Sequence, residues 1–378
     1  MNFTEYKRIA NALKMQPSNK YSTWDNIMQL CLNMYEDNQD YLKYCLKLSK
    51  SVKLSAQRLL LQNRDVRFED LYWQAVKFEA PHLFDSYLLY LERKRLEQDR
   101  FYSPKRKQLN KHGLIQSLQD MEDDKLDILS ISMPPGTQKT TLEKFFCSWI
   151  IGRHPDDFSL FFSHSGDITR MFYDGVMDIT TNSDEYCWQE IFPDVKFHST
   201  NAKRETINFN KYKPFSNIQC TSVGSKNAGK VRANRYLYCD DLIGGIEEAL
   251  NKNILDKLWR IYGTDAKQRK MDGCKEIHIA TRWSVHDVIG RLIDIYEGND
   301  KARFIAIPDI DPVTGESNFD YKYNGFSVKF FHDQELTMDE ISYKCLYKNE
   351  PIEREGLLYT DEELRRFITL PLGEPDAI

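Results

Sequence analysis

The chain has 378 residues, of which 41% are hydrophobic and 29% charged, with a formal net charge of −5. These proportions exclude a disordered chain, and no stretch approaches the roughly 20 consecutive apolar residues of a membrane span. The first residues lack the apolar core of a signal peptide. The net charge does not indicate nucleic-acid binding, although a local basic face would suffice for it.

The cysteines indicate a reducing compartment. All eight are scattered, mostly among apolar residues, with no C-x-x-C pair and no histidine at zinc-ligand spacing. This pattern is typical of reduced packing residues in a cytosol.

The periodicity divides the chain into three parts. Residues 1–100 show a helical pattern that ends in a helix with Phe84, Tyr87 and Leu88 on one face. We therefore predict a small helical N-terminal domain over 1–100 and an α/β core over 101–310. Residues 311–378 show little periodicity, and we expect a loop-rich end there.

From about residue 125, short apolar runs alternate with amphipathic helices. Helices between strands imply right-handed crossovers, so the pattern predicts a mostly parallel central sheet flanked by helices. Strands are expected at 127–133, 158–163, 236–239 and 276–280, a hairpin around 205–222, and helices at 139–150, near 168–179 and near 247–263.

The segment Met-Pro-Pro-Gly-Thr-Gln-Lys-Thr, residues 133–140, lies between a predicted strand and a predicted helix. Its end matches the last residues of the phosphate loop G-x-x-x-x-G-K-S/T. Lys139 would reach the β and γ phosphates of ATP, and the Thr140 hydroxyl would bind Mg²⁺. Because Met133 and Gln138 stand where that pattern has glycines, the alternative is an ordinary turn with a solvated lysine.

Backbone N–H groups at a helix start can hold phosphates. The loop residues predicted to bind the nucleotide are Pro135, Gly136, Thr137, Gln138, Lys139, Thr140 and Thr141. Upstream, Tyr102 could stack on the adenine and Gln108 could hydrogen-bond its edge. The alternative for this upstream segment is a basic loop after a long helix.

An apolar strand over residues 235–241 ends in two carboxylates. Asp240 would hold Mg²⁺, and Asp241 would polarise the attacking water. The alternative is a solvated Asp-Asp turn before Gly244. The loop and the acidic strand end, about a hundred residues apart in the appropriate strand contexts, support each other.

A third apolar strand, within residues 277–283, ends in a hydroxyl and a guanidinium. Ligands bind outside the carboxyl ends of strands in open α/β sheets. Thr281 could therefore sense the γ-phosphate and Arg282 could relay its loss. The alternative is an exposed arginine beside a core tryptophan.

In chain order, these segments resemble the ATPase domain of the large terminase subunit of tailed bacteriophages. The proline pair at 134–135 is similar to that family's M-P-P-x-x-x-K-S/T loop, and residues 281–291 resemble its T-R-W-x-x-x-D-l-x-g-r-l segment. The resemblance spans about 101–372. The chain departs from the family at Gly136, where arginine is common, and at Gln138, where glycine is common.

The resemblance implies a phosphate-loop ATPase that uses ATP and Mg²⁺ to move double-stranded DNA into a procapsid. Its implied partners are the DNA, the portal protein, the small terminase subunit and further copies of itself in a ring, in the host cell cytoplasm and without a membrane. Asp241, Lys139, Thr281 and Arg282 would be the catalytic residues, and Thr140 and Asp240 would be the metal ligands.

Residues 367–376 resemble the start of the family's linker to a nuclease domain. We therefore expect the gene to continue past Ile378 and the 378-residue chain not to cut DNA. Since Gly136 replaces the loop arginine, we also expect an arginine from elsewhere, with Arg232 and Arg235 as candidates.

Two other functions stay open at this point. A helicase or another DNA-directed ATPase would share the loop and the acidic strand, but the segment beginning at Thr281 argues against it. A degenerate nucleotide-binding module without turnover would explain the missing glycines, whereas the intact Lys139, Thr140, Asp240 and Asp241 oppose it.

Overall fold

The structure is a computed structural model that describes residues 73, 76–225 and 231–351. Most of the predicted helical N-terminal domain, and the segment 367–376, therefore lie outside the described residues. Within these ranges, no helix is long and apolar enough to cross a membrane.

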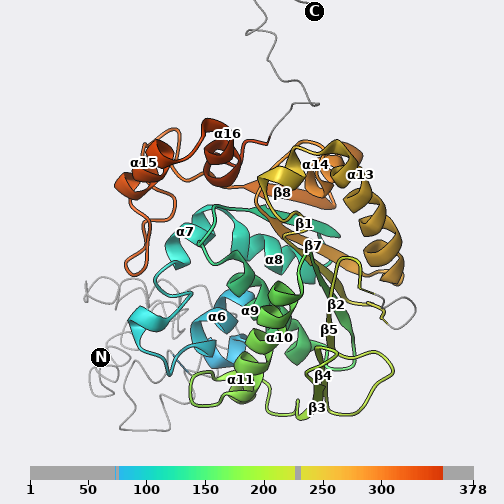
Figure 1. Cartoon of the computed structure of the whole chain (residues 1–378). Helices are drawn as coiled ribbons and strands as arrows, with labels where there is room; N and C mark the ends of the chain where they lie inside the picture. Colours follow the sequence, from blue (N-terminus) through green and yellow to red (C-terminus); the bar gives the residue numbers. More distant parts are fainter. Residues whose placement is uncertain (1–72, 74–75, 226–230, 352–378) are drawn as a thin grey trace, which may run out of the picture.

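The centre of the molecule is an eight-stranded sheet in the order β3-β4-β5-β2-β6-β7-β1-β8 (Figure 1). The strands from β5 to β8 in this order run parallel, while β4 is antiparallel to both of its neighbours. The bounds are β1 Ile128–Ser132, β2 Ser159–Ser163, β3 Phe197–Asn201, β4 Thr206–Phe209, β5 Ile218–Ser222, β6 Tyr236–Asp240, β7 Lys275–Ala280 and β8 Ala302–Ala306. The predicted α/β class with a mostly parallel sheet is confirmed.

Helices connect these strands and cover the sheet (Figure 1). Those before β6 are α6 Phe84–Leu91, α7 Arg106–Lys111, α8 Leu114–Glu122, α9 Lys139–Arg153, α10 Gly166–Thr181 and α11 Trp188–Ile191. Those after it are α12 Ile246–Ala249, α13 Lys252–Ile261, α14 Val288–Ile295, α15 Val328–Thr337 and α16 Glu340–Tyr343.

Successive side chains of the central strands enter two different cores. On β6, Tyr236 and Tyr238 join the large core with α9 and α10, whereas Leu237 and Cys239 join a smaller core that includes Leu292 of α14. Both faces of the sheet are therefore buried, which explains why these strands are continuous apolar runs rather than alternating ones.

Helix α6 belongs to this same core. The Phe84 ring lies 5.2 Å from those of Phe146 and Trp149, and the Trp149 indole donates a hydrogen bond to Ala80 O at 2.9 Å. Over the described residues there is thus no break in packing at residue 100. The helical domain predicted for the preceding residues stays a prediction.

The expected loop-rich end is only partly correct. Residues 311–327 are mostly irregular, but α15, α16 and a π-helical turn over Lys344–Lys348 follow, drawn in orange to red in Figure 1. Phe331, Tyr343 and Tyr347 are buried, and the Tyr343 and Tyr347 rings are stacked at 5.1 Å. Widely spaced aromatic residues on short helices leave little periodicity to detect.

Gly290, in the first turn of α14, allows the close approach of this helix to the chain before it. A Cβ at residue 290 would lie 2.0 Å from Val285 O and 2.6 Å from Val285 C. The Gly290 N–H also donates to the Asp287 carboxylate that caps the helix, at 2.6 Å. The Val285 carbonyl carbon and oxygen cannot move away from residue 290 without disturbing this cap.

We predict that Gly290→Ala lowers the free energy of unfolding by about 1–3 kcal/mol, because overpacking against backbone cannot be relieved by a rotamer change. Urea denaturation checks this. The matched control is Gly263→Ala, where an added Cβ meets nothing within 4 Å. Equal stability of the two variants would contradict the close approach.

Candidate functional site

The carboxyl ends of three neighbouring strands form the site. Strand β7 lies between β1 and β6, with Ser132 opposite Ala280 and Ile279 opposite Asp240. The segments that follow these strands therefore leave the sheet at one edge, where ligands bind in open α/β folds. The sequence predicted this convergence from three separate segments.

The loop between β1 and α9 has a left-handed backbone conformation at Gln138, where the phosphate-loop pattern has a glycine. Gln138 has φ 67°, in the left-handed region that glycine adopts most easily, and it is the N-cap of α9. For a non-glycine residue this conformation costs about 1–2 kcal/mol. The Thr137 hydroxyl donates to Pro134 O at 2.7 Å and closes the loop. Gln138 thus adopts the backbone conformation that the glycine of the pattern would adopt.

Lys139 lies at the start of α9, with its ammonium folded over the loop. Its Nζ donates to Met133 O at 2.7 Å and lies 3.3 Å from the Thr281 hydroxyl. Burial lowers the pKa of Lys139, and the neighbouring Asp241 and Asp240 oppose that shift. The lysine and the positive end of the α9 dipole thus lie at one point, beside the strand end at Thr281.

The two carboxylates stand beside this lysine. Asp240 is 2% exposed and accepts a hydrogen bond from the Thr140 hydroxyl at 2.7 Å. Burial and the adjacent Asp241 raise the pKa of Asp240 to about 7, although Thr140 and Lys139 act in the opposite direction. Burial also raises the pKa of Asp241. A cation bound here would relieve the cost of keeping both groups ionised.

The donor set fits Mg²⁺. This ion prefers oxygen ligands and is commonly held by one or two carboxylates together with substrate phosphates. The Thr140 hydroxyl and the buried Asp240 carboxylate supply two adjacent oxygens. Among the described residues, no group of three or more His, Cys, Asp or Glu could hold a metal ion. Phosphate oxygens and water would therefore have to complete the coordination.

Asp241 is fixed in an uncommon backbone conformation at the end of β6. Its φ is 48°, its N–H donates to Ile279 O at 2.8 Å, and its own carbonyl accepts the His164 N–H at 3.4 Å. The His164 ring also contacts this carbonyl through Nδ1. Strained residues of this kind cluster at functional sites. His164 was not predicted as a site residue from the sequence.

Thr281 and Arg282 connect the site to α14. Arg282 is 7% exposed, and its Nε lies 3.6 Å from Asp287 Oδ2. Asp287 caps α14, so the end of β7 is tied to the start of that helix. The alternative of an exposed arginine is therefore wrong, whereas a relay role for Arg282 stays a prediction.

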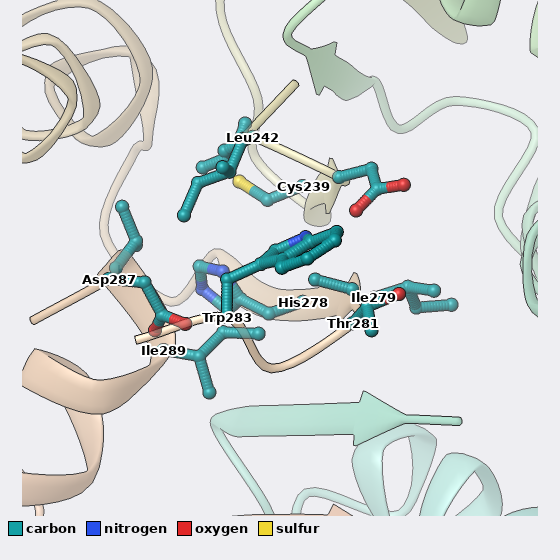
Figure 2. A pocket seen from close by; sticks show the side chains of 12 residues that line it. Cys239, Leu242, His278, Ile279, Thr281, Trp283, Asp287 and Ile289 are labelled. Atoms are coloured by element: carbon teal, nitrogen blue, oxygen red, sulfur yellow. The ribbon is translucent and has the colours of Figure 1, made fainter. Parts of the chain in front are cut away.

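An apolar pocket adjoins the site beside Thr281. Figure 2 shows the Trp283 ring between Ile279 and Leu242, with Asp287 at one side. Trp283 is 9% exposed and packs in a core cluster with Cys345. The pocket thus links the strand ends to the helices on the second face of the sheet.

Tyr102 does not fit its predicted role. Its side chain is fully buried, and its hydroxyl contacts Asp85 and accepts a hydrogen bond from Asn110 at 2.9 Å. A ring in the core cannot stack on adenine, so this prediction is wrong. Gln108 is half-buried on α7 and donates to Asp320 O at 3.1 Å; its contact with adenine stays a prediction.

Arg235 is also misassigned. It precedes β6 and so lies at the opposite edge of the sheet from Asp240, and its Nη2 donates to Glu122 at 2.7 Å. Burial would raise the pKa of Glu122, but hydrogen bonds from His154 and Arg235 lower it to about 2. Arg235 therefore serves a buried structural ion pair. Arg232 is exposed at the same end of the strand.

The described cysteines agree with the sequence prediction. Those that the structure describes are all free and buried: Cys147, Cys187, Cys220, Cys239, Cys274 and Cys345.

These features define an α/β fold in which the loop over residues 133–140 and an acidic strand end meet. No family model and no curated protein match the chain. Among solved structures, the large terminase ATPase domain of Thermus phage P74-26 is similar at TM-score 0.41 and 8% identity, over 62% of this chain and 93% of that one. The HK97 bacteriophage large terminase is similar at TM-score 0.42 and 11% identity, over 70% of this chain and 54% of that one.

The matched structures belong to the family that the sequence segments resemble. The chain spans about half the length of the HK97 protein.

Glu143, one turn after Lys139, is a buried acid whose two carboxylate oxygens have no hydrogen-bond partner among the described residues. Burial raises its pKa well above the ordinary value, and the charge of Asp240 adds to this. Ionising the group in the folded state is therefore unfavourable. Its contribution becomes more destabilising as the pH rises above 4.5, its ordinary pKa, towards the higher folded-state pKa.

We predict that Glu143→Met raises the free energy of unfolding by about 1–3 kcal/mol near neutral pH, since it removes an unsatisfied buried polar group. The gain should be smaller at about pH 5, where the unfolded chain ionises its glutamates less. Urea denaturation at both pH values measures it. The control is Glu247→Met on α12, where the side chain is exposed. A gain that does not change with pH would contradict the pKa shift.

Proposed function

We propose that this chain is an ATPase that hydrolyses ATP to translocate viral double-stranded DNA, as the motor subunit of a large terminase. The observation that carries the proposal is the hydrogen bond of 2.7 Å between Thr140 of the loop and Asp240 of the acidic strand. It joins the two oxygens that a nucleotide-bound Mg²⁺ would need. Lys139, Asp241 and Thr281 surround this pair.

In the proposed reaction, the loop amides and the start of α9 hold the phosphates. Lys139 leaves Met133 O and reaches the β and γ phosphates, while Thr140 and Asp240 hold Mg²⁺. When bound, Mg²⁺ neutralises charge on the phosphate oxygens. Asp241 orients the attacking water and accepts its proton.

Coupling would begin at Thr281. Its hydroxyl lies 3.3 Å from the Lys139 ammonium, so movement of Lys139 to a phosphate changes this contact. Thr281 is followed by Arg282, which lies against the cap of α14. We therefore propose that loss of the γ-phosphate is transmitted along this path to α14.

The motor assignment rests on the resemblance of residues 133–140 and 281–291 to terminase motifs. Double-stranded DNA, a portal protein, a small terminase subunit and a ring of identical subunits in the host cytoplasm are part of this proposal. A helicase would separate strands, so a forked-duplex unwinding assay beside a DNA-stimulated ATPase assay discriminates between the two. A degenerate module would bind nucleotide without turnover.

We predict that Asp241→Asn lowers the turnover number by about 10²–10⁴-fold while the affinity for MgATP stays nearly unchanged, because the amide cannot accept the proton. Phosphate release and titration of a non-hydrolysable ATP analogue measure the two quantities. Asp272→Asn, at an exposed position, is the control. Wild-type turnover in Asp241→Asn would remove this residue from the reaction.

We predict that Lys139→Ala weakens both ATP binding and turnover, because the variant loses the positive charge that would contact the β and γ phosphates. Gln138→Gly should retain activity, since glycine adopts the left-handed conformation without strain. The same two assays apply. Normal binding and hydrolysis by Lys139→Ala would show that the phosphate loop has been misplaced.

A further inference from the structure

A second lysine contacts the phosphate loop from outside it. Lys105 precedes α7 and is 4% exposed. Its ammonium donates a hydrogen bond to the side-chain oxygen of Gln138, the residue directly before Lys139. Segments more than thirty residues apart thus place a second cation against the loop.

The surroundings of Lys105 are apolar. Its Nζ lies 4.5 Å from the centre of the Phe101 ring and 5.3 Å from that of Tyr321. No carboxylate among the described residues lies within ion-pair distance of it. Glu92 is the charged group that acts on it most, but the carboxylate of Glu92 accepts the backbone N–H groups of Phe101 and Tyr102.

A desolvated cation without an ion-pair partner is costly for a folded protein to maintain. Burial lowers the pKa of Lys105 to about 8, which expresses that cost. The Gln138 amide and the two ring faces offset it only in part. An anion brought to this position would remove it.

The loop itself offers little positive charge. Among residues 133–140 only Lys139 is ionisable, and its ammonium also faces Asp240 and Asp241. Phe326 covers Gly136, with the ring 3.2 Å from the position that a Cβ would take. A further cation for the phosphates, in addition to Lys139, would therefore come from a neighbouring segment, and Lys105 already contacts the loop.

We propose that Lys105 is a second phosphate-binding lysine, which contacts the polyphosphate of a nucleotide held in the loop. This inference rests on the proposed ATPase function and extends it to a residue outside the loop and the acidic strand. The ammonium exchanges its bond to Gln138 for a phosphate oxygen, or makes both bonds together. The Phe101 and Tyr321 rings fix its direction.

The rival role is structural, in which Lys105 only holds Gln138 in its left-handed conformation. Glycine needs no such support at residue 138. In a Gln138→Gly background, a supporting lysine would therefore be dispensable, whereas a phosphate-binding lysine would not. This difference separates the two roles in the full chain.

The experiment titrates Mg²⁺ with a non-hydrolysable ATP analogue, and separately with ADP, into the wild type, Lys105→Met, Gln138→Gly and the double variant. We expect Lys105→Met to weaken binding of the analogue by about 10–100-fold in both backgrounds, the usual range for one charged hydrogen bond. A larger loss for the analogue than for ADP assigns the contact to the γ-phosphate, and an equal loss assigns it to the β-phosphate. Both results support the inference.

Two further variants act as controls. Lys107→Met removes an exposed lysine from α7, two residues after Lys105, and should bind like the wild type. Lys105→Arg keeps its charge at high pH, so its affinity should fall less than that of the wild type between about pH 7.5 and 9. Thermal denaturation of each variant identifies any that fail to fold. If Lys105→Met fails to fold, the pH dependence of binding by Lys105→Arg provides the test.

The outcomes separate the two proposals. Suppose that the wild type binds and hydrolyses ATP. If Lys105→Met then binds ATP as tightly as the wild type, or loses affinity only when Gln138 is present, Lys105 is not a phosphate ligand. The ATPase proposal stands in that case. If the wild type binds no nucleotide, the proposed function itself fails.

Discussion

The shared edge of three parallel strands is the constraint on which the site depends. Strands β1, β7 and β6 end together because their register is fixed over the whole length of the sheet. Asp240 is buried on the same face as Tyr238, towards α9, where it meets Thr140. A slip of β6 by one residue would turn Asp240 to the other face of the sheet and separate it from the loop. The strand register that packs the aromatic core therefore also places Asp240 at the site.

The site also concentrates buried charge. Lys139, Asp240, Asp241 and Glu143 lie within two neighbouring segments, and burial shifts the pKa of each towards its neutral form. Such shifts are common where proteins bind charged ligands, because the folded chain maintains groups that water would solvate better. A phosphate-bound cation would satisfy two of the carboxylates together with Lys139. The stability of this edge should therefore depend strongly on bound nucleotide.

Much of the sheet could be predicted because buried parallel strands are short apolar runs, as at 158–163 and 236–239. Strand β3 was missed because its sequence Phe-His-Ser-Thr-Asn is polar and mostly exposed, and β8 because it is a half-buried edge strand. The residues that converge at the site followed from strand ends, which is a local rule. Tyr102 and Arg235 failed because their roles depend on distant partners, Asp85 and Glu122.

The close contact between Gly136 and Phe326 also constrains how this sequence can change. A side chain at residue 136 would meet the Phe326 ring at 3.2 Å, and the φ of 76° would add strain. A larger residue there would require the Phe326 ring to shift by a few tenths of an ångström or residue 326 to become smaller. The effect of a substitution at residue 136 should therefore depend on the residue at 326. Among natural variants of this chain, residue volume at one position should vary inversely with that at the other.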